Sequence, residues 1–168
     1  MKTPQGWTDC YLRVGDISVG LRWRVVLNRS AFSESQVNQL IVLTLLKMGF
    51  HLPRSHPVEF KLPQTECKTA TAHHYGMMTG KHRWSSIAIN KVGDGTISIF
   101  NAAQLMASLA HELEHARQWA KKIGNSKPGF HGDYHERTAA RAAEHMLVHL
   151  VSDDSAITEL HATVEGKE

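Results

Sequence analysis

The chain has 168 residues, 42% of them hydrophobic, which suits one compact domain spanning residues 1–168. Its 19 Lys and Arg against 16 Asp and Glu give a net charge of +3 without any basic run, so we expect no direct binding of nucleic acid. The isolated Cys10 and Cys67 exclude a disulfide framework, and no apolar run suggests a signal peptide or a membrane span. These features predict a cytoplasmic protein with no membrane partner.

The first helix of the chain is predicted after one or two short strands within residues 1–30. Ser33, with Gln36 three positions later, has the spacing of a capping box. Apolar residues then recur at helical intervals as far as Met48, and Gly49 is expected to end the helix.

The middle of the chain predicts short strands and loops. Residues 51–81 contain three of the five prolines and predict loops, with one strand around VEFKL. The runs HRWSSIAIN (82–90) and TISIF (96–100) are rich in β-forming residues and flank the turn-like VGDG. We expect these two runs to form a hairpin or two neighbouring strands.

Two long helices are predicted in the C-terminal half. Asn101 is a good N-cap for a helix that runs to about Ile123, and a further helix begins near Asp133 or Tyr134 and ends near residue 151. Residues 152–168 are predicted to form a polar tail, with a short final helix as the alternative. The predicted fold class is therefore α+β, a short β-sheet with three main helices, with the two helices within about 101–151 carrying the function.

The functional prediction rests on His111-Glu-Leu-Glu-His115, which fits the pattern HExxH. Residues four apart lie on one face of a helix, so His111 and His115 can bind one metal ion. Glu112 can then act on a water molecule whose pKa the metal lowers towards about 7. Apolar residues form one stripe of this helix, and a polar stripe predicted to face a cleft contains Gln104, Ser108, His111, His115 and Gln118. The pattern favours a catalytic zinc site with one ion per chain.

A catalytic zinc ion takes three protein ligands and keeps one open position. The candidates for the third ligand are His131, His135 and Glu136. We favour Glu136, because it opens the apolar face of the last long helix and a carboxylate there needs a partner. Ala139, Ala140 and Ala143 on the same helix would let it approach the HExxH helix closely. The alternative is that Glu136 only favours the positive N-terminal end of its own helix.

His111-Glu112-x-x-His115 followed by Glu136-x-x-Ala139 resembles the gluzincin arrangement, in particular that of the small ImmA/IrrE-like metallopeptidases. The resemblance covers residues 105–150. It implies a small zincin-like fold whose metal site lies between the HExxH helix and the next helix, with His111, His115 and Glu136 as zinc ligands. It also implies that Glu112 is the general base and that the protein hydrolyses peptide bonds in a peptide or protein substrate.

A second resemblance is to SprT-like metallopeptidases, which act on DNA-associated proteins and take a third histidine from a loop. Phe130-His131-Gly132 and Tyr134-His135 fit that pattern loosely. A third possibility is a non-catalytic zinc-binding domain, in which a fourth protein ligand such as His131 or His135 closes the zinc site. A fourth is an interaction protein whose HExxH motif no longer supports turnover.

Other polar and aromatic residues are expected to have structural roles. We expect Glu114 to be solvated, Trp119 to pack, and His145 and His149 to be exposed. His73 and His74 are expected in a surface loop rather than along the cleft. Tyr134 is either an oxyanion donor or a packing residue.

Overall fold

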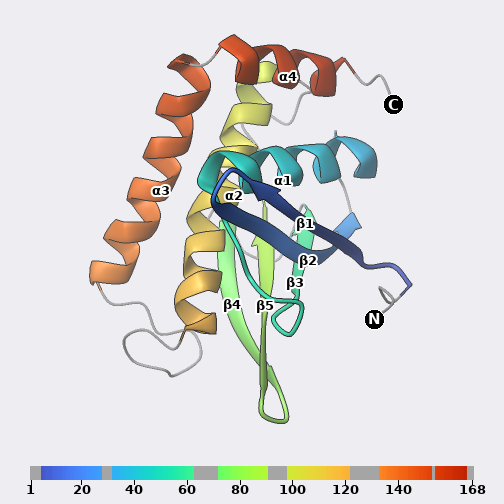
Figure 1. Cartoon of the computed structure of the whole chain (residues 1–168), viewed down its shortest axis with the longest axis vertical. Helices are drawn as coiled ribbons and strands as arrows, with labels where there is room; N and C mark the ends of the chain where they lie inside the picture. Colours follow the sequence, from blue (N-terminus) through green and yellow to red (C-terminus); the bar gives the residue numbers. More distant parts are fainter. Residues whose placement is uncertain are drawn as a thin grey trace.

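The computed structural model describes residues 5–27, 32–62, 72–90, 98–121, 133–152 and 154–165, without the side chains of 133–135, 151, 152, 154 and 156. It contains five strands and four helices in these residues (Figure 1). The strands are β1 (Thr8–Val14), β2 (Ile17–Leu27), β3 (Val58–Leu62), β4 (Ala72–Thr79) and β5 (His82–Ile89). The helices are α1 (Glu34–Met48), α2 (Ile99–Ala120), α3 (Asp133–Ser152) and α4 (Asp154–Val164). The predicted α+β class is confirmed.

The five strands form one mixed sheet in the order β1-β2-β3-β5-β4. The outer pairs β1–β2 and β4–β5 are antiparallel, whereas β3 runs parallel to both β2 and β5. Helix α1 packs on β2, α2 packs on β4 and β5, and the two helices contact each other. Helix α3 lies beside α2, and α4 crosses near one end of both (Figure 1). The core lies between the helices and the sheet.

Helix α1 has the ends that the sequence predicts. The Ser33 hydroxyl accepts a hydrogen bond from the Gln36 backbone, and the Gln36 side chain accepts one from the Ser33 backbone, so the capping box is confirmed. Gly49 adopts a φ of 63°, the left-handed conformation that glycine tolerates best, and ends the helix. No helix in the described part of the chain is long and apolar enough to cross a membrane.

The prediction of loops across residues 51–81 is wrong for residues 72–79, although the strand at VEFKL is confirmed as β3. Residues 72–79 form β4, which pairs with β5 through a two-residue turn at Gly80 and Lys81. Gly80 has a φ of 61°, which suits the tight turns that match the twist of a hairpin. The hairpin partner of the predicted strand at 82–90 is therefore β4.

The prediction of a strand at 96–100 is wrong for residues 99 and 100, because α2 begins at Ile99. Ser98 is the N-cap, and its hydroxyl accepts a hydrogen bond from the Asn101 backbone at 3.0 Å. Serine caps a helix about as well as asparagine, so the helix starts earlier than predicted and Asn101 is buried inside it. Residues 96 and 97 lie outside the described residues.

The C-terminal segment is more structured than a polar tail. Residues 154–164 form α4, which buries Leu160 and Thr163. The Gln36 side chain donates a hydrogen bond to the Thr163 carbonyl at 3.1 Å, which ties α4 to the start of α1.

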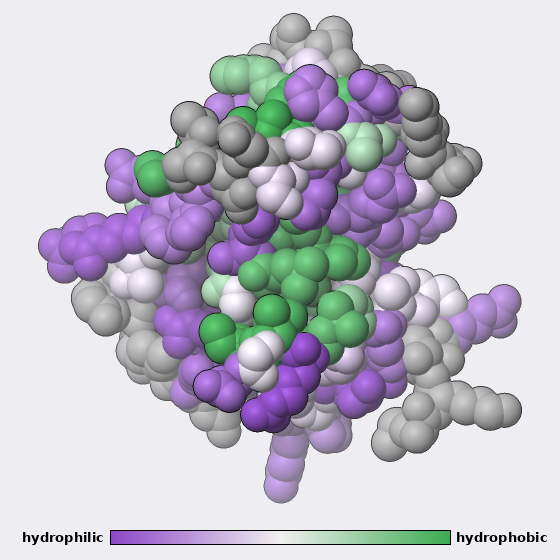
Figure 2. All heavy atoms as spheres, turned by 45° about the horizontal axis from the view of Figure 1, so that its top comes forward, coloured by the Kyte–Doolittle hydropathy of each residue, from purple (hydrophilic) through white to green (hydrophobic). Residues whose placement is uncertain are grey.

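Figure 2 shows one face of the molecule, where apolar side chains gather between polar ones. The exposed large hydrophobic residues include Leu12, Val14, Ile17 and Leu46.

Candidate metal centre

Helix α2 supplies the two histidines of the HExxH pattern. Its apolar stripe, Leu105, Leu109, Leu113 and Ala116, is fully buried and holds the helix against the core. His111 and His115 lie one turn apart on the side that faces α3, with ring centroids 5.1 Å apart. Gln104, Ser108 and His111 line a cleft as predicted, whereas His115 and Gln118 are buried instead.

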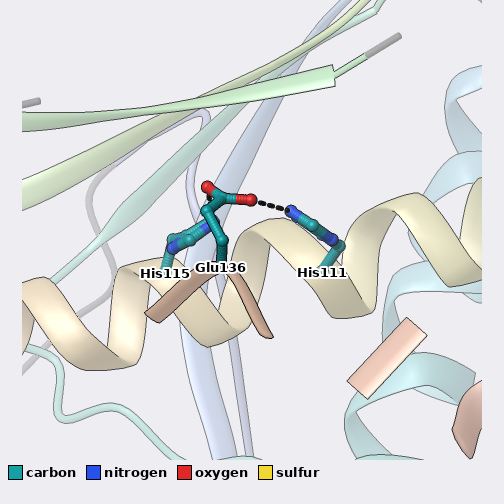
Figure 3. Close-up of side chains that lie close together, drawn as sticks. All are labelled: His111, His115 and Glu136. Carbon is teal, nitrogen blue, oxygen red and sulfur yellow. Dashed lines mark ion pairs between the residues drawn. The ribbon is translucent and has the colours of Figure 1, made fainter. Parts of the chain in front are cut away.

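Glu136, in the first turn of α3, lies between the two histidines (Figure 3). Its Oε1 is 3.0 Å from Nε2 of His115, and its Oε2 is 3.6 Å from Nε2 of His111. These three residues could hold a metal ion, since their ligand atoms all lie within 4.8 Å of one another. Two helices that follow one another in the chain, α2 and α3, thus bring together the three predicted ligands.

The two competing ligands are not among the side chains that the structure describes. His131 and the side chain of His135 lie outside the described residues, as does the side chain of Tyr134. Ala139 is buried against the neighbouring elements and Ala143 lines the cleft, but Ala140 is exposed. The prediction that all three alanines allow close approach is therefore wrong for Ala140, which lies on the outer face of α3.

His115 is held in the form that binds metals. Its Nδ1 is 2.9 Å from Oε1 of Gln118, and because that amide oxygen only accepts, Nδ1 carries the proton. Burial lowers the pKa of His115, which favours the neutral imidazole. The other nitrogen, Nε2, is then the ligand atom directed towards Glu136. Such support of a metal-binding histidine by an acceptor on its far side is usual in metal sites.

The donor set suits zinc. Zinc binds imidazole nitrogen at about 2.0–2.1 Å and carboxylate oxygen at about 2.0–2.2 Å, which places neighbouring ligand atoms about 3.4 Å apart in a tetrahedral site. The contacts of Glu136 with the two histidines span this value. The Glu136 side chain is 49% exposed, so solvent leaves it room to change its position relative to the two histidines.

Glu112 lies beside the three candidate ligands but belongs to a different face of α2. Its carboxylate is buried, and its Oε1 is 3.8 Å from Nε2 of His111. Burial, with a smaller contribution from the Glu136 carboxylate, raises the pKa of Glu112 to about 8. The backbone N–H of His74 opposes this rise by donating a hydrogen bond to the Glu112 carboxylate.

A cleft of about 340 Å³ opens beside the candidate ligands. Its walls come from α2, α3 and the start of β4: Ala72, Gln104, Ala107, Ser108, His111, Glu112, Ala143 and Leu147. Both His111 and Glu112 therefore reach a space that a ligand can enter. Strand β4, at the end of the sheet order, borders this space.

His74 was expected in a surface loop and is instead buried on β4, so that expectation is wrong. Its ring lies 6.3 Å from the ring of His115 and hydrogen-bonds to the Ser85 hydroxyl. The sequence does contain a signal for this strand. Residues 72–79 are separated from the predicted strand at 82–90 by only two residues, Gly80 and Lys81, which is the spacing of a hairpin. His73, beside it, is half-buried and packs against Tyr75.

The expectation for Glu114 is also wrong, because this carboxylate is buried and pairs with Arg117 one turn later. Trp119 packs as predicted: it is buried, and its indole N–H donates to the Trp84 carbonyl at 3.1 Å. His145 and His149 are exposed as predicted, with their Nε2 atoms 3.0 Å apart.

Comparison of the chain with protein-family models, with curated proteins and with solved structures finds no match. The gluzincin resemblance therefore remains a prediction that depends on the residues of the HExxH and ExxA patterns and on their geometry.

Proposed function

We propose that this protein is a zinc-dependent metallopeptidase of the gluzincin kind. One zinc ion per chain is held by His111, His115 and Glu136, and Glu112 is the general base. The observation that carries the proposal is the meeting of the three ligand atoms within 4.8 Å, contributed by two separate helices. A histidine pair on a solvent-exposed helix surface would not require a carboxylate from another helix.

The chemistry follows from the positions of these side chains. When bound, zinc acts as a Lewis acid that polarises the peptide carbonyl and makes water acidic near neutral pH. Glu112 takes the proton from the attacking water and delivers it to the leaving amine. A carboxyl group whose pKa is raised towards neutrality can perform both transfers, and the nearby cation would favour its ionised form.

A peptide is the substrate that this surface suits best. Strand β4 ends the sheet order among the described strands and borders the cleft, so its outer side can pair with an extended chain. Backbone pairing of this kind recognises any extended peptide, and the residues that line the cleft then select among sequences.

We also propose a cytoplasmic location, where thiols such as the half-buried Cys10 stay reduced.

Metal content tests the ligand assignment. The purified protein should contain one zinc per chain by mass spectrometry, and Glu136→Ala should lose it while His131→Ala and His135→Ala keep it. The double variant His145→Ala/His149→Ala is the matched control, because it removes another histidine pair four residues apart on a helix. Zinc lost with His131→Ala or His135→Ala instead would favour the SprT-like reading, and a wild-type protein that takes up no zinc would contradict the proposal.

Hydrolysis of fluorescently labelled casein tests the reaction. Glu112→Gln should retain zinc and lose at least about a hundredfold in kcat, because the amide cannot accept the proton. Glu144→Gln, an exposed position on α3, should behave as the wild type. Zinc binding without any hydrolysis by the wild type would instead support the non-catalytic zinc-binding domain.

A further inference from the structure

A chain of three buried polar side chains lies behind the candidate metal centre. The Ser85 hydroxyl on β5 is 2.8 Å from Nε2 of His74 on β4, and it is also 2.8 Å from Nε2 of His56, which lies just before β3. All three side chains are almost completely shielded from solvent. The hydroxyl thus links β4 to the segment that precedes β3, across β5.

The single proton of the Ser85 hydroxyl limits the directions of its two hydrogen bonds. A serine hydroxyl has one proton to donate, so it can donate to only one of the two imidazoles and must accept from the other. Burial lowers the pKa of His56 to about 4, so this ring is neutral near pH 7. The Ser85 hydroxyl provides a hydrogen-bond partner for two buried ring nitrogens at once, which alanine or any other apolar residue could not do.

His74 also connects these buried side chains to the candidate metal centre. The backbone N–H of His74 donates a hydrogen bond to the Glu112 carboxylate, and the ring of His74 lies beside that of His115. Strand β4 has a strand partner, β5, on one side only among the described strands. The position of the His74 amide therefore depends on the pairing of β4 with β5 and on the side-chain contacts that hold β4 in place. The hydrogen bond between the His74 ring and the Ser85 hydroxyl is such a contact.

We propose that Ser85 is a positioning residue for Glu112. It holds the His74 ring against β5 and the His56 segment, and the His74 backbone amide is thereby held where the Glu112 carboxylate meets it. The kinetic consequence rests on the function proposed above, whereas the effect on the His74 amide does not.

Ser85→Ala removes the hydroxyl and leaves two buried imidazole nitrogens without this shared partner. The His74 ring then loses one of its contacts, and β4 is held less firmly over α2. We expect exchange of the His74 amide proton, measured by NMR on the zinc-loaded protein, to become at least about tenfold faster. With labelled casein as the substrate, we expect kcat to fall by about tenfold or more at unchanged KM and unchanged zinc content.

Two further variants make the measurement specific. Ser85→Cys keeps the volume with a weaker hydrogen-bonding group, and should fall between the wild type and Ser85→Ala. Thr44→Val is the matched control, because it removes another fully buried hydroxyl, one that bonds only within α1 to the Leu40 carbonyl at 2.7 Å. It should lower stability without changing either the His74 amide or kcat.

The two proposals fail in different ways. Unchanged exchange of the His74 amide in both Ser85 variants would overturn the role of Ser85, whatever the kinetics show, and so would an equal acceleration in Thr44→Val. A wild-type protein that cleaves no casein, or a Glu112→Gln variant that still does, would overturn the proposed function, and the amide measurement would then decide the role of Ser85 alone.

Discussion

At the scale of single residues, the candidate site depends on how each side chain is held. His115 has a buried ring whose Nδ1–H is directed at Gln118, which leaves Nε2 as the candidate ligand atom. Glu136 is half exposed and can adjust, and Glu112 is buried beside the ligands and fixed by a backbone amide. One rigid ligand and one adjustable ligand give a site that needs little rearrangement to accept a metal ion.

Replacing Gln118 tests the support of His115. Gln118→Leu keeps a similar volume but removes the acceptor for Nδ1–H, so the ring loses its fixed tautomer and orientation. We expect zinc affinity to fall by about 10–100-fold, as is usual when such a partner is lost. Competition with a fluorescent zinc chelator measures it, and an affinity equal to that of the wild type would show that Gln118 does not orient the ligand.

The pH dependence of stability tests the buried His56. Its pKa in the folded protein is about 4, below the ordinary value of 6.5, so between these values the unfolded chain binds a proton that the folded chain does not. Stability is therefore fully present above about pH 6.5 and declines as the pH falls towards 4, by at most about 3 kcal/mol.

Urea unfolding of the zinc-free protein at pH 7.5 and pH 5.0 measures this loss. Between those pH values His56→Gln should lose about 2 kcal/mol less free energy of unfolding than the wild type. The other histidines are common to both proteins, so the difference isolates His56. Equal losses in the two proteins would mean that His56 takes up a proton in the folded state.

At the scale of elements, the site depends on the approach of α3 to α2. Helix α2 is anchored by its leucine stripe, and α3, which packs against it, buries Ala139, Met146 and Leu150. Because Glu136 lies one turn before Ala139, the small side chain at 139 sets how close the carboxylate comes to the histidines. The packing of the two helices would therefore control the geometry of the candidate metal site.

Enlarging Ala139 should separate the two helices. Ala139→Leu overfills a buried contact, so we expect a loss of about 1–3 kcal/mol in the free energy of unfolding together with weaker zinc binding. Ala140→Leu is the matched control, because the neighbouring alanine is exposed and should tolerate the same change. Urea unfolding and zinc titration measure both effects, and equal behaviour of the two variants would contradict the packing of α3 on α2.

At the scale of the whole molecule, the candidate ligands come from two separate helices, which only the folded chain brings together. His111 and His115 lie on α2, and Glu136 lies on α3 after an intervening segment. An ion that binds all three binds the folded state and not the unfolded chain. Its binding energy therefore adds to the stability of the whole fold.

Removal of zinc should lower the melting temperature. At free zinc about 100 times the dissociation constant, binding contributes about 2.7 kcal/mol, which corresponds to roughly 5–10 °C for a chain of this size. Calorimetry with and without a chelator measures the shift, and Glu136→Ala should show a much smaller one. An identical melting temperature for the wild type with and without zinc would contradict a site made by both helices.

Much of the fold and of the site was predictable, and the misses share a cause. The ends of α1, the strand β3 and the helical face that joins His111 to His115 all follow from patterns within a few residues, and these predictions are confirmed. The strand β4 and the burial of Glu114 were missed. Both depend on neighbours from elsewhere in the chain, which a short pattern does not contain.

The sequence alone determined what helix geometry makes local: two histidines and a glutamate on one turn of α2, and a glutamate near the start of α3. Only the tertiary structure decided that the Glu136 carboxylate lies within 3.6 Å of both imidazoles, and that β4 places the His74 amide on Glu112. The physical reason is that spacing along a helix follows from its hydrogen bonds, whereas the distance between two helices or between a strand and a helix is the sum of many weak packing contacts.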